Sequence, residues 1–159
     1  MTPSPGKWSR MSTVSAQAAR QRRFRKGGEN LTQVWLIDGM NLIGSRPDGW
    51  WKDPDRAMRT LAGRLDEYVE RTGEHVVLVF DRQPSDFQTP PSLNVVFAPS
   101  GGRNAADYVI ESLVDQDPEP ARLRVVTSDK RLAERVERRG ARVTGSARFR
   151  TRLERALAG

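Results

Sequence analysis

The 159-residue chain contains no cysteine, and this absence excludes several kinds of site. Without thiols there is no disulfide framework, no thiolate metal centre and no cysteine nucleophile. His75 is the only histidine, so cleavage by a pair of histidines is excluded. A Ser-His-Asp triad is disfavoured as well, because His75 begins an apolar segment whereas the acids stand at the ends of such segments.

Glycine-rich nucleotide loops and long apolar runs are also missing. Neither Gly-x-x-x-x-Gly-Lys-Ser/Thr nor a Gly-x-Gly-x-x-Gly after the first apolar segment is present, which disfavours binding of nucleoside triphosphates and dinucleotides. No apolar run approaches the roughly 18 residues of a membrane span. We therefore expect a soluble protein with no membrane partner, and the lack of cysteine suits a cytoplasmic location.

The net charge of +7 is distributed unevenly along the chain. Residues 1–33 carry seven Lys/Arg and one acid, residues 34–129 carry ten against sixteen, and residues 130–159 carry ten against three. Basic ends indicate a polyanionic partner, but an acidic centre repels a polyanion unless cations neutralise it. A nucleic-acid enzyme that uses metal ions satisfies both conditions; solvated arginine-rich helix faces are the alternative.

The length predicts one domain with a sizeable core and a tail. Residues 1–32 have no sustained hydrophobic period, so we expect them to form a disordered basic arm, and residues 33–159 to form the folded domain with a basic C-terminal helix. Phe24 stands inside the most basic part of the arm and is suited to stacking on a base, although a solvated terminus is the alternative. Its basic neighbours are expected to contact phosphates: Arg22, Arg23, Arg25 and Lys26.

Short apolar runs alternate with segments of helical period, which predicts an α/β fold with a mostly parallel central sheet of about five strands and right-handed crossovers. The expected strands are 34–38, 75–80, 94–97, 123–126 and 141–143, and the expected helices are 54–72, 105–115, 130–139 and 147–158. Polar loops are expected at 44–52 and 82–93. Trp50 and Trp51 in the first loop are suited either to stacking on bases or to capping the core.

Four aspartates stand where this fold binds ligands. Asp38, Asp81 and Asp129 follow three of the strands, and Asp107 lies in the first turn of a helix. Each has a local explanation, such as a turn, a helix cap or the helix dipole, but the carboxyl ends of parallel strands meet at one edge of the sheet. Four carboxylates gathered there would repel one another without hard divalent cations, so we expect Mg²⁺ or Mn²⁺.

Neutral and basic side chains near the same edge complete the predicted site. Asn41, Asn104, Thr127 and Ser128 are suited to orienting carboxylates or holding a phosphate oxygen. Arg103, Lys130 and Arg131 are expected to contact the nucleic-acid backbone. Metal ions held by such acids activate water and stabilise the charge that develops during in-line displacement at phosphorus.

Four segments resemble, in order, the motifs of the NYN branch of PIN-like ribonucleases and, within it, the YacP-like group: residues 38–43, 79–81, 104–110 and 126–129. The resemblance covers roughly residues 33–150. It implies a three-layer α/β/α PIN-like fold and metal-dependent endonucleolytic cleavage of RNA.

The resemblance also implies roles for single residues. Asp38, Asp107 and Asp129 would bind metal, Asp81 would be a further catalytic acid, and Asn41 would support the site. Two positions depart from the family pattern. Met40 replaces an aromatic residue that is usual after the first Asp-Gly, and Tyr108 stands where many relatives have a second acid.

We therefore expect an Mg²⁺- or Mn²⁺-dependent endoribonuclease whose partner is RNA. A non-catalytic adaptor that binds RNA or the ribosome through a degenerate PIN-like site is the main alternative. A small-molecule phosphatase that uses the same acids is a third candidate, but it leaves the basic arm unexplained. The RNA target, the number of metal ions and the oligomeric state stay open.

Overall fold

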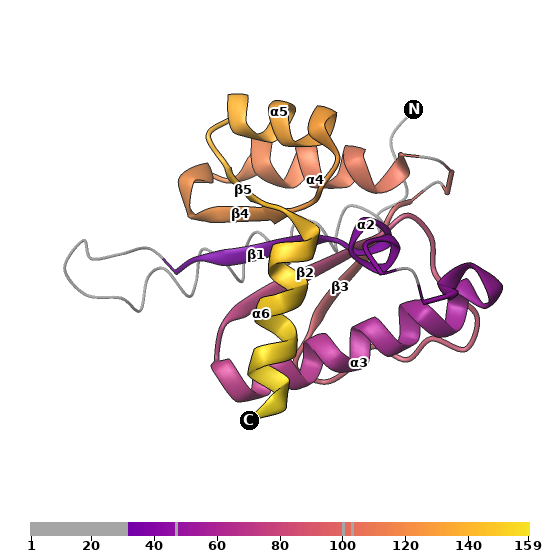
Figure 1. The fold of residues 1–159 in the computed structure, drawn as a ribbon. Helices are drawn as coiled ribbons and strands as arrows, with labels where there is room; N and C mark the ends of the chain where they lie inside the picture. Colours follow the sequence, from indigo (N-terminus) through magenta and orange to yellow (C-terminus); the bar gives the residue numbers. More distant parts are fainter. Residues whose placement is uncertain (1–31, 47, 100, 103) are drawn as a thin grey trace.

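The computed structural model describes residues 32–46, 48–99, 101–102 and 104–159. Within them, one sheet of five parallel strands has the order β3-β2-β1-β4-β5 (Figure 1). The α/β prediction is confirmed, with a sheet that is parallel throughout. The strands are β1 (Val34–Asp38), β2 (His75–Phe80), β3 (Asn94–Phe97), β4 (Leu123–Val126) and β5 (Arg142–Thr144), the last one residue later than expected.

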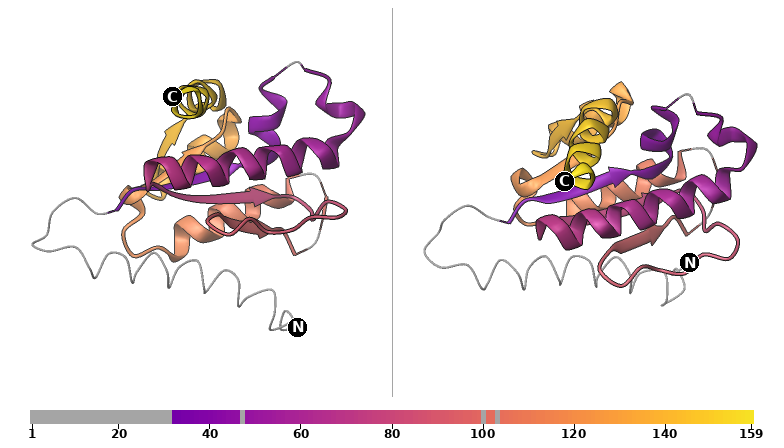
Figure 2. Two further views of the ribbon diagram at one scale, coloured as in Figure 1. Left: turned by 90° about the horizontal axis from the view of Figure 1, so that it is seen from below. Right: turned by 60° about the horizontal axis from the view of Figure 1, so that its bottom comes forward.

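Helices cover both faces of the sheet, which confirms the predicted three layers (Figures 1 and 2). One face packs against α4 (Ala105–Gln116) and α5 (Lys130–Arg138). The other face packs against α2 (Gly39–Gly44), α3 (Pro54–Thr72) and α6 (Ser146–Ala158). None of the helices in the described ranges is long and apolar enough to cross a membrane.

The central position of β1 in the sheet explains why the first four residues of this strand are all apolar. All five of its residues are buried, because helices lie on both sides of it. Leu36 faces the α4 side, whereas Trp35 and Ile37 face the α3 side. Asp38 is the last residue of this strand and therefore stands where the two buried faces open at the end of the sheet.

The helix boundaries follow from the capping residues in the sequence. Asp53 accepts a hydrogen bond from the backbone N–H of Arg56 at 3.1 Å, and Gly73 ends α3 with a φ of 71°. Asp129 caps α5 by accepting from the backbone N–H groups of Arg131 and Leu132 at 2.9 and 3.3 Å. The local explanation of Asp129 as an N-cap is therefore correct, whatever else this side chain does.

Helix α2 is an element that the sequence patterns did not predict. It begins at Gly39, directly after Asp38, and only glycine fits there. A Cβ at this position would lie 2.6 Å from the Phe80 ring and 2.9 Å from the backbone oxygen of Val79. The predicted loop 44–52 also contains a short 3₁₀ helix, η1 (Trp50–Lys52). The predicted arm lies outside the described residues, apart from Thr32.

Two acids at the N-terminal edge of the sheet, where the strands begin, are paired with cations. Just before β4, Arg122 and Asp117 form a buried ion pair with a shortest N–O distance of 2.5 Å. Just before β2, Glu74 accepts hydrogen bonds from the Trp35 indole and the Tyr68 hydroxyl, both at 2.7 Å. The guanidinium of Arg152 lies 3.2 Å from the same carboxylate. This edge therefore balances its buried and half-buried acids with cations.

Candidate active site

Asp38 is the buried acid at the C-terminal edge of the sheet, where the strands end. The residue is 6% exposed, and its carboxylate accepts a hydrogen bond from the Thr127 hydroxyl at 3.1 Å. Thr127 follows β4, the strand that pairs with β1, so the parallel register brings the two residues together across 89 positions of sequence. No cation forms an ion pair with Asp38 within the described part of the chain. Its negative charge is therefore poorly compensated.

The environment of Asp38 changes its acidity. The pKa of its carboxyl is raised to about 7, chiefly by burial and then by the negative charges of Asp107 and Asp129, while the hydrogen bond from Thr127 opposes the shift. Burial also raises the pKa of Asp107, together with the charge of Asp129. These mutual effects show that Asp38, Asp107 and Asp129 lie close enough to interact, and we call them the aspartate cluster.

Asn41 holds the loop after β4 against the first turn of α2. Its side-chain oxygen accepts from the Ser128 backbone N–H at 2.8 Å and from the Ser146 hydroxyl at 2.6 Å. The Ser128 hydroxyl in turn accepts from the backbone N–H of Ser146 at 3.0 Å. Thr127 is linked to Asn41 through Asp38, whose carboxylate accepts from the Thr127 hydroxyl at 3.1 Å and from the backbone N–H of Asn41. Three of the four predicted supporting residues are thus joined in one network.

Asn104, the fourth predicted supporting residue, is placed differently. It is exposed, has a φ of 67°, and its backbone oxygen accepts from the N–H of Asp107 at 3.1 Å. Among the described residues its side chain makes no hydrogen bond. Asn104 therefore contributes by shaping the turn that leads into α4, and its amide does not reach the other supporting residues.

Asp81 lies at the same edge, beyond the end of β2. Asp38 is in register with Val79, so Asp81 stands two residues further along the neighbouring strand. Its Oδ1 atom is buried and has no hydrogen-bond partner among the described residues. A buried carboxylate oxygen without a hydrogen-bond donor lowers the stability of the folded protein. The Asp81 Oδ1 atom is therefore a candidate to accept a hydrogen bond or to bind a cation.

The predicted backbone-contacting cations are only partly described. Lys130 and Arg131 are exposed in the first turn of α5, directly after Asp129. Their ammonium and guanidinium groups are therefore available to solvent beside the aspartate cluster. The other predicted contacts lie outside the described residues: Arg22, Arg23, Arg25, Lys26 and Arg103.

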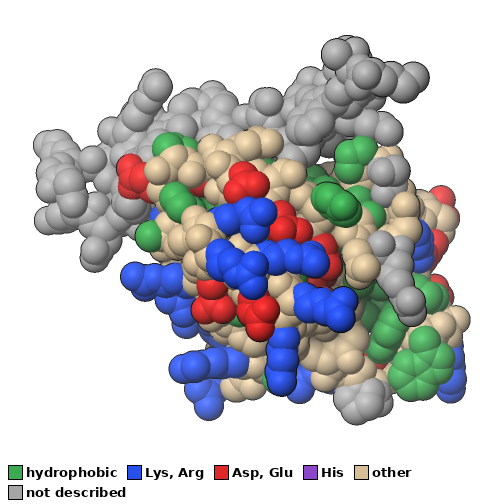
Figure 3. All heavy atoms as spheres, turned by 90° about the horizontal axis from the view of Figure 1, so that it is seen from above, with side chains coloured by type: hydrophobic (Ala, Val, Ile, Leu, Met, Phe, Trp, Pro, Cys, Tyr) green, Lys and Arg blue, Asp and Glu red, His purple; other side chains and the backbone are tan. Residues whose placement is uncertain are grey.

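Two contributors to the site were missed by the sequence patterns. Ser146 is fully buried and donates to Asn41, but the 105 residues that separate the two leave no local signal. Glu111 stands one helical turn after Asp107 and raises its pKa, a neighbour that i, i+4 spacing could have revealed. Arg135 of α5 and Arg139, which follows the end of that helix, lie 3.5 and 3.4 Å from Glu111. Figure 3 shows a face of the molecule on which basic and acidic side chains lie next to one another.

The fit of this site to a metal ion rests on its donor atoms. Within the described ranges, no three acidic or histidine side chains stand close enough together to form a complete metal-binding group. The donors are carboxylate oxygens, which hard divalent cations prefer. The raised pKa values of Asp38 and Asp107 and the unpartnered oxygen of Asp81 show a shortage of positive charge and donors that such a cation would relieve.

The sequence model of the YacP-like NYN domain matches residues 35–158. The chain belongs to the YacP-like NYN domain family. Membership confirms the resemblance seen in the motifs, and it indicates a nuclease-like function related to RNA.

Solved structures of this family share the fold. A crystal structure of a Rae1 (YacP) mutant from Bacillus subtilis matches with a TM-score of 0.65 and 25% identity, covering 79% of this chain and 77% of that one. A second crystal structure of Rae1 (YacP) matches with a TM-score of 0.62, 25% identity, and coverage of 79% and 76%. A comparison with curated protein sequences found no match.

The two departures from the family pattern have different surroundings. Met40 is partly buried and packs against the core between the sheet and α3. Tyr108 is 77% exposed and stands directly after Asp107 on α4. The position after Asp107 therefore points to solvent and offers no second acid.

Proposed function

We propose that this YacP-like NYN protein is a divalent-metal-dependent endoribonuclease that hydrolyses RNA phosphodiester bonds. The observation that carries the proposal is the burial of Asp38 at the C-terminal edge of the sheet, with Asp107 and Asp129 beside it and no paired cation among the described residues. Buried carboxylates that lower the stability of a fold are typical of sites with a catalytic or metal-binding role. The family supplies the link to RNA.

In this proposal each side chain has a defined task. Asp38, Asp107 and Asp129 would hold Mg²⁺ or Mn²⁺, and Asp81 would be a further acid at the same edge. Such an ion, when bound, supplies water activation and stabilises charge at phosphorus. Thr127 fixes the Asp38 carboxylate through its 3.1 Å hydrogen bond, and Asn41 fixes the loop that carries Asp129.

The basic residues beside the cluster would position the substrate. Lys130 and Arg131 are exposed at the start of α5, immediately after Asp129, where they can contact the RNA phosphates that flank the cleaved bond. These contacts carry no sequence information, so specificity must come from other surfaces. RNA is accordingly the proposed partner, and the proposal includes RNA that is bound to the ribosome.

The test is cleavage of a labelled single-stranded RNA with and without divalent metal. We expect cleavage with Mg²⁺ or Mn²⁺, none in excess chelator, and a loss of at least roughly 10³-fold in Asp38→Asn, because one of the ligands is neutralised. Asp115→Asn is the matched control, since Asp115 lies on α4 in an exposed pair with Arg139. Cleavage by Asp38→Asn at the wild-type rate would refute the proposal.

The adaptor is the second candidate, and two observations favour it. The described side chains do not form a complete metal-binding group, and Tyr108 provides no acid where many relatives have one. An adaptor binds RNA with equal affinity in metal and in chelator and leaves it uncut. RNA affinity measured by fluorescence anisotropy in both conditions, beside the cleavage assay, separates the two functions.

A further inference from the structure

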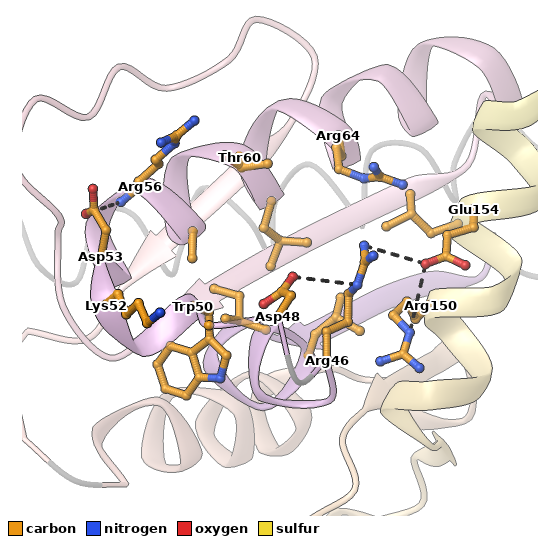
Figure 4. Close-up of a pocket in the computed structure, with 16 residues that line it drawn as sticks. Arg46, Asp48, Trp50, Lys52, Asp53, Arg56, Thr60, Arg64, Arg150 and Glu154 are labelled. Carbon is orange, nitrogen blue, oxygen red and sulfur yellow. Dashed lines mark hydrogen bonds and ion pairs between the residues drawn. The ribbon is translucent and has the colours of Figure 1, made fainter.

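A basic cavity lies on the α3 side of the sheet, and none of the aspartate cluster lines it (Figure 4). It has a volume of about 380 Å³, is open to solvent, and is lined by residues of α2, η1, α3 and α6 and of the loop between α2 and α3. Its apolar lining comes from Leu42, Ile43, Leu61 and Leu153. The indole of Trp50 lies at one end of the cavity and Glu154 of α6 at the other (Figure 4).

The acids around this cavity are already engaged. Glu154 pairs with Arg46 at 3.7 Å and with Arg150 at 3.9 Å. Asp48 pairs with Arg46 at 3.7 Å, and Asp53 caps α3 through the Arg56 backbone N–H. Arg150 in addition donates to the Ser45 hydroxyl at 3.0 Å.

Three cations of the cavity are left without an acid. Among the described residues, the side chains of Lys52, Arg56 and Arg64 make no ion pair or hydrogen bond, although they line the same space. Lys52 and Arg56 are exposed, and Arg64 is half-buried. The cavity therefore combines an apolar floor with unpaired positive charge, which suits a ligand that has a flat apolar part and an anionic part.

The cavity and the aspartate cluster share two helices. On α2, Asn41 supports the cluster while the next two residues, Leu42 and Ile43, line the cavity. On α6, Ser146 donates to Asn41, and Arg150 one turn later lines the cavity. A ligand in the cavity therefore lies beside the edge of the sheet at which the acids gather.

We propose that this cavity binds one nucleotide of single-stranded RNA, next to the phosphate that the aspartate cluster cleaves; the proposal rests on the function proposed above. The base lies on the apolar floor against the Trp50 indole, and the adjoining phosphates contact Lys52, Arg56 and Arg64. Aromatic and apolar surfaces accept any base, and arginine matches the geometry of phosphate. A volume of about 380 Å³ lies in the range of sites that bind one small ligand, such as a single nucleotide.

The test measures RNA affinity in chelator, so that it does not depend on cleavage. The probe is a fluorescein-labelled single-stranded oligouridylate of eight nucleotides, followed by anisotropy. We expect Arg56→Gln/Arg64→Gln to bind at least 10-fold more weakly than wild type, with a salt dependence whose slope falls by about 0.7 for each lost phosphate contact. Arg138→Gln/Arg142→Gln is the control for charge, because both arginines are exposed and belong to α5 and β5, neither of which lines the cavity.

Affinity of the double variant within twofold of this control would overturn the proposal, because the loss would then be one of net charge alone. A 16-base-pair RNA duplex serves as the second probe, and an equal loss for duplex and single strand would also overturn it. Trp50→Ala provides an independent variant that keeps every cation; we expect at least a 3-fold loss of affinity for the single strand.

Failure of the two proposals is distinguishable in these experiments. If wild type binds the oligouridylate through the cavity but cuts no RNA with any divalent metal, the nuclease is wrong and the nucleotide site stands. If it cuts RNA in metal while the cavity variants bind like the control, the nucleotide site is wrong and the nuclease stands. Thermal unfolding of each variant confirms that it is folded under assay conditions.

Discussion

The two edges of the same sheet treat buried acids in opposite ways. At the N-terminal edge, Asp117 is paired with Arg122. Burial alone would raise the pKa of Glu74, but its hydrogen bonds with Tyr68 and Trp35 and the charge of Arg152 lower it overall. At the C-terminal edge, burial and neighbouring acids raise the pKa of Asp38 to about 7. One edge is arranged for stability, and the other keeps an unfavourable charge.

This difference indicates that the folded state is destabilised at the C-terminal edge, where we expect the functional site. A buried acid with a partner is tolerated, whereas a buried acid without one lowers the stability of the folded state. The uncompensated charge of Asp38 therefore points to the C-terminal edge as the functional site. Substitutions of Asp117, Asp38 and Asn41 test this difference between the two edges.

The largest effect on stability is expected from breaking the compensated edge. Asp117→Ala leaves the Arg122 guanidinium buried with its carboxylate partner removed, so we expect a loss of roughly 3–5 kcal/mol in the free energy of unfolding. Urea denaturation measures it. Asp115→Ala removes the exposed pair with Arg139 and should cost less than about 1 kcal/mol. An equal loss of unfolding free energy in Asp117→Ala and Asp115→Ala would show that the buried ion pair stabilises the fold no more than the exposed one.

Neutralising the uncompensated edge should have the opposite sign. Between pH 4 and pH 7 the folded protein keeps a proton on Asp38 that the unfolded chain has released, so the stability of the metal-free wild type falls as pH rises. Asp38→Asn removes this dependence. We expect the variant to be more stable than wild type at pH 8 by roughly 2–4 kcal/mol, at about 1.4 kcal/mol for each pH unit of the shift.

The control for this prediction is the same pair of proteins at pH 4. There Asp38 is protonated in the folded state and the advantage of the variant should disappear. Urea denaturation in chelator at both pH values provides the measurement. A variant that is less stable than wild type at pH 8 would contradict the description of Asp38 as an uncompensated acid.

A smaller effect is expected from Asn41, which joins the elements of the C-terminal edge. Asn41→Ala leaves the buried Ser146 hydroxyl and the Ser128 N–H without their acceptor, so we expect a loss of about 1–3 kcal/mol. Asn41→Asp keeps an acceptor at the same place while adding a fourth negative charge near the aspartate cluster. Asn41→Ala with wild-type stability would show that the network seen around this residue is dispensable.

The positions of the acids were predictable because they follow from strand order. Asp38, Asp81 and Asp129 stand at or just beyond the ends of strands, and Asp107 is in the first turn of the helix that follows β3. Parallel strands bring such positions to one edge regardless of loop length. The same argument predicted that Thr127 and Ser128 would lie near Asn41. Strands and long helices were predictable for a similar reason, since hydrophobic period and caps such as Asp53 and Gly73 are local signals.

Contacts between distant segments could not be predicted in this way. Ser146 reaches Asn41 only because α6 crosses back over β1, and no pattern near either residue records that crossing. Helix α2 is too short to show a hydrophobic period, and the need for glycine at its start comes from the Phe80 ring on another strand. The basic cavity also depends on residues from α2, η1, α3 and α6, which explains why it emerged only from the structure.

The most direct test of the central claim is a crystal structure of the protein soaked in Mn²⁺ at pH 8. The account predicts anomalous density for manganese at the C-terminal edge, with carboxylate oxygens of Asp38, Asp107 and Asp129 as ligands. Ordered carboxylates in this cluster with no manganese density between them, in crystals soaked to saturation, would contradict it.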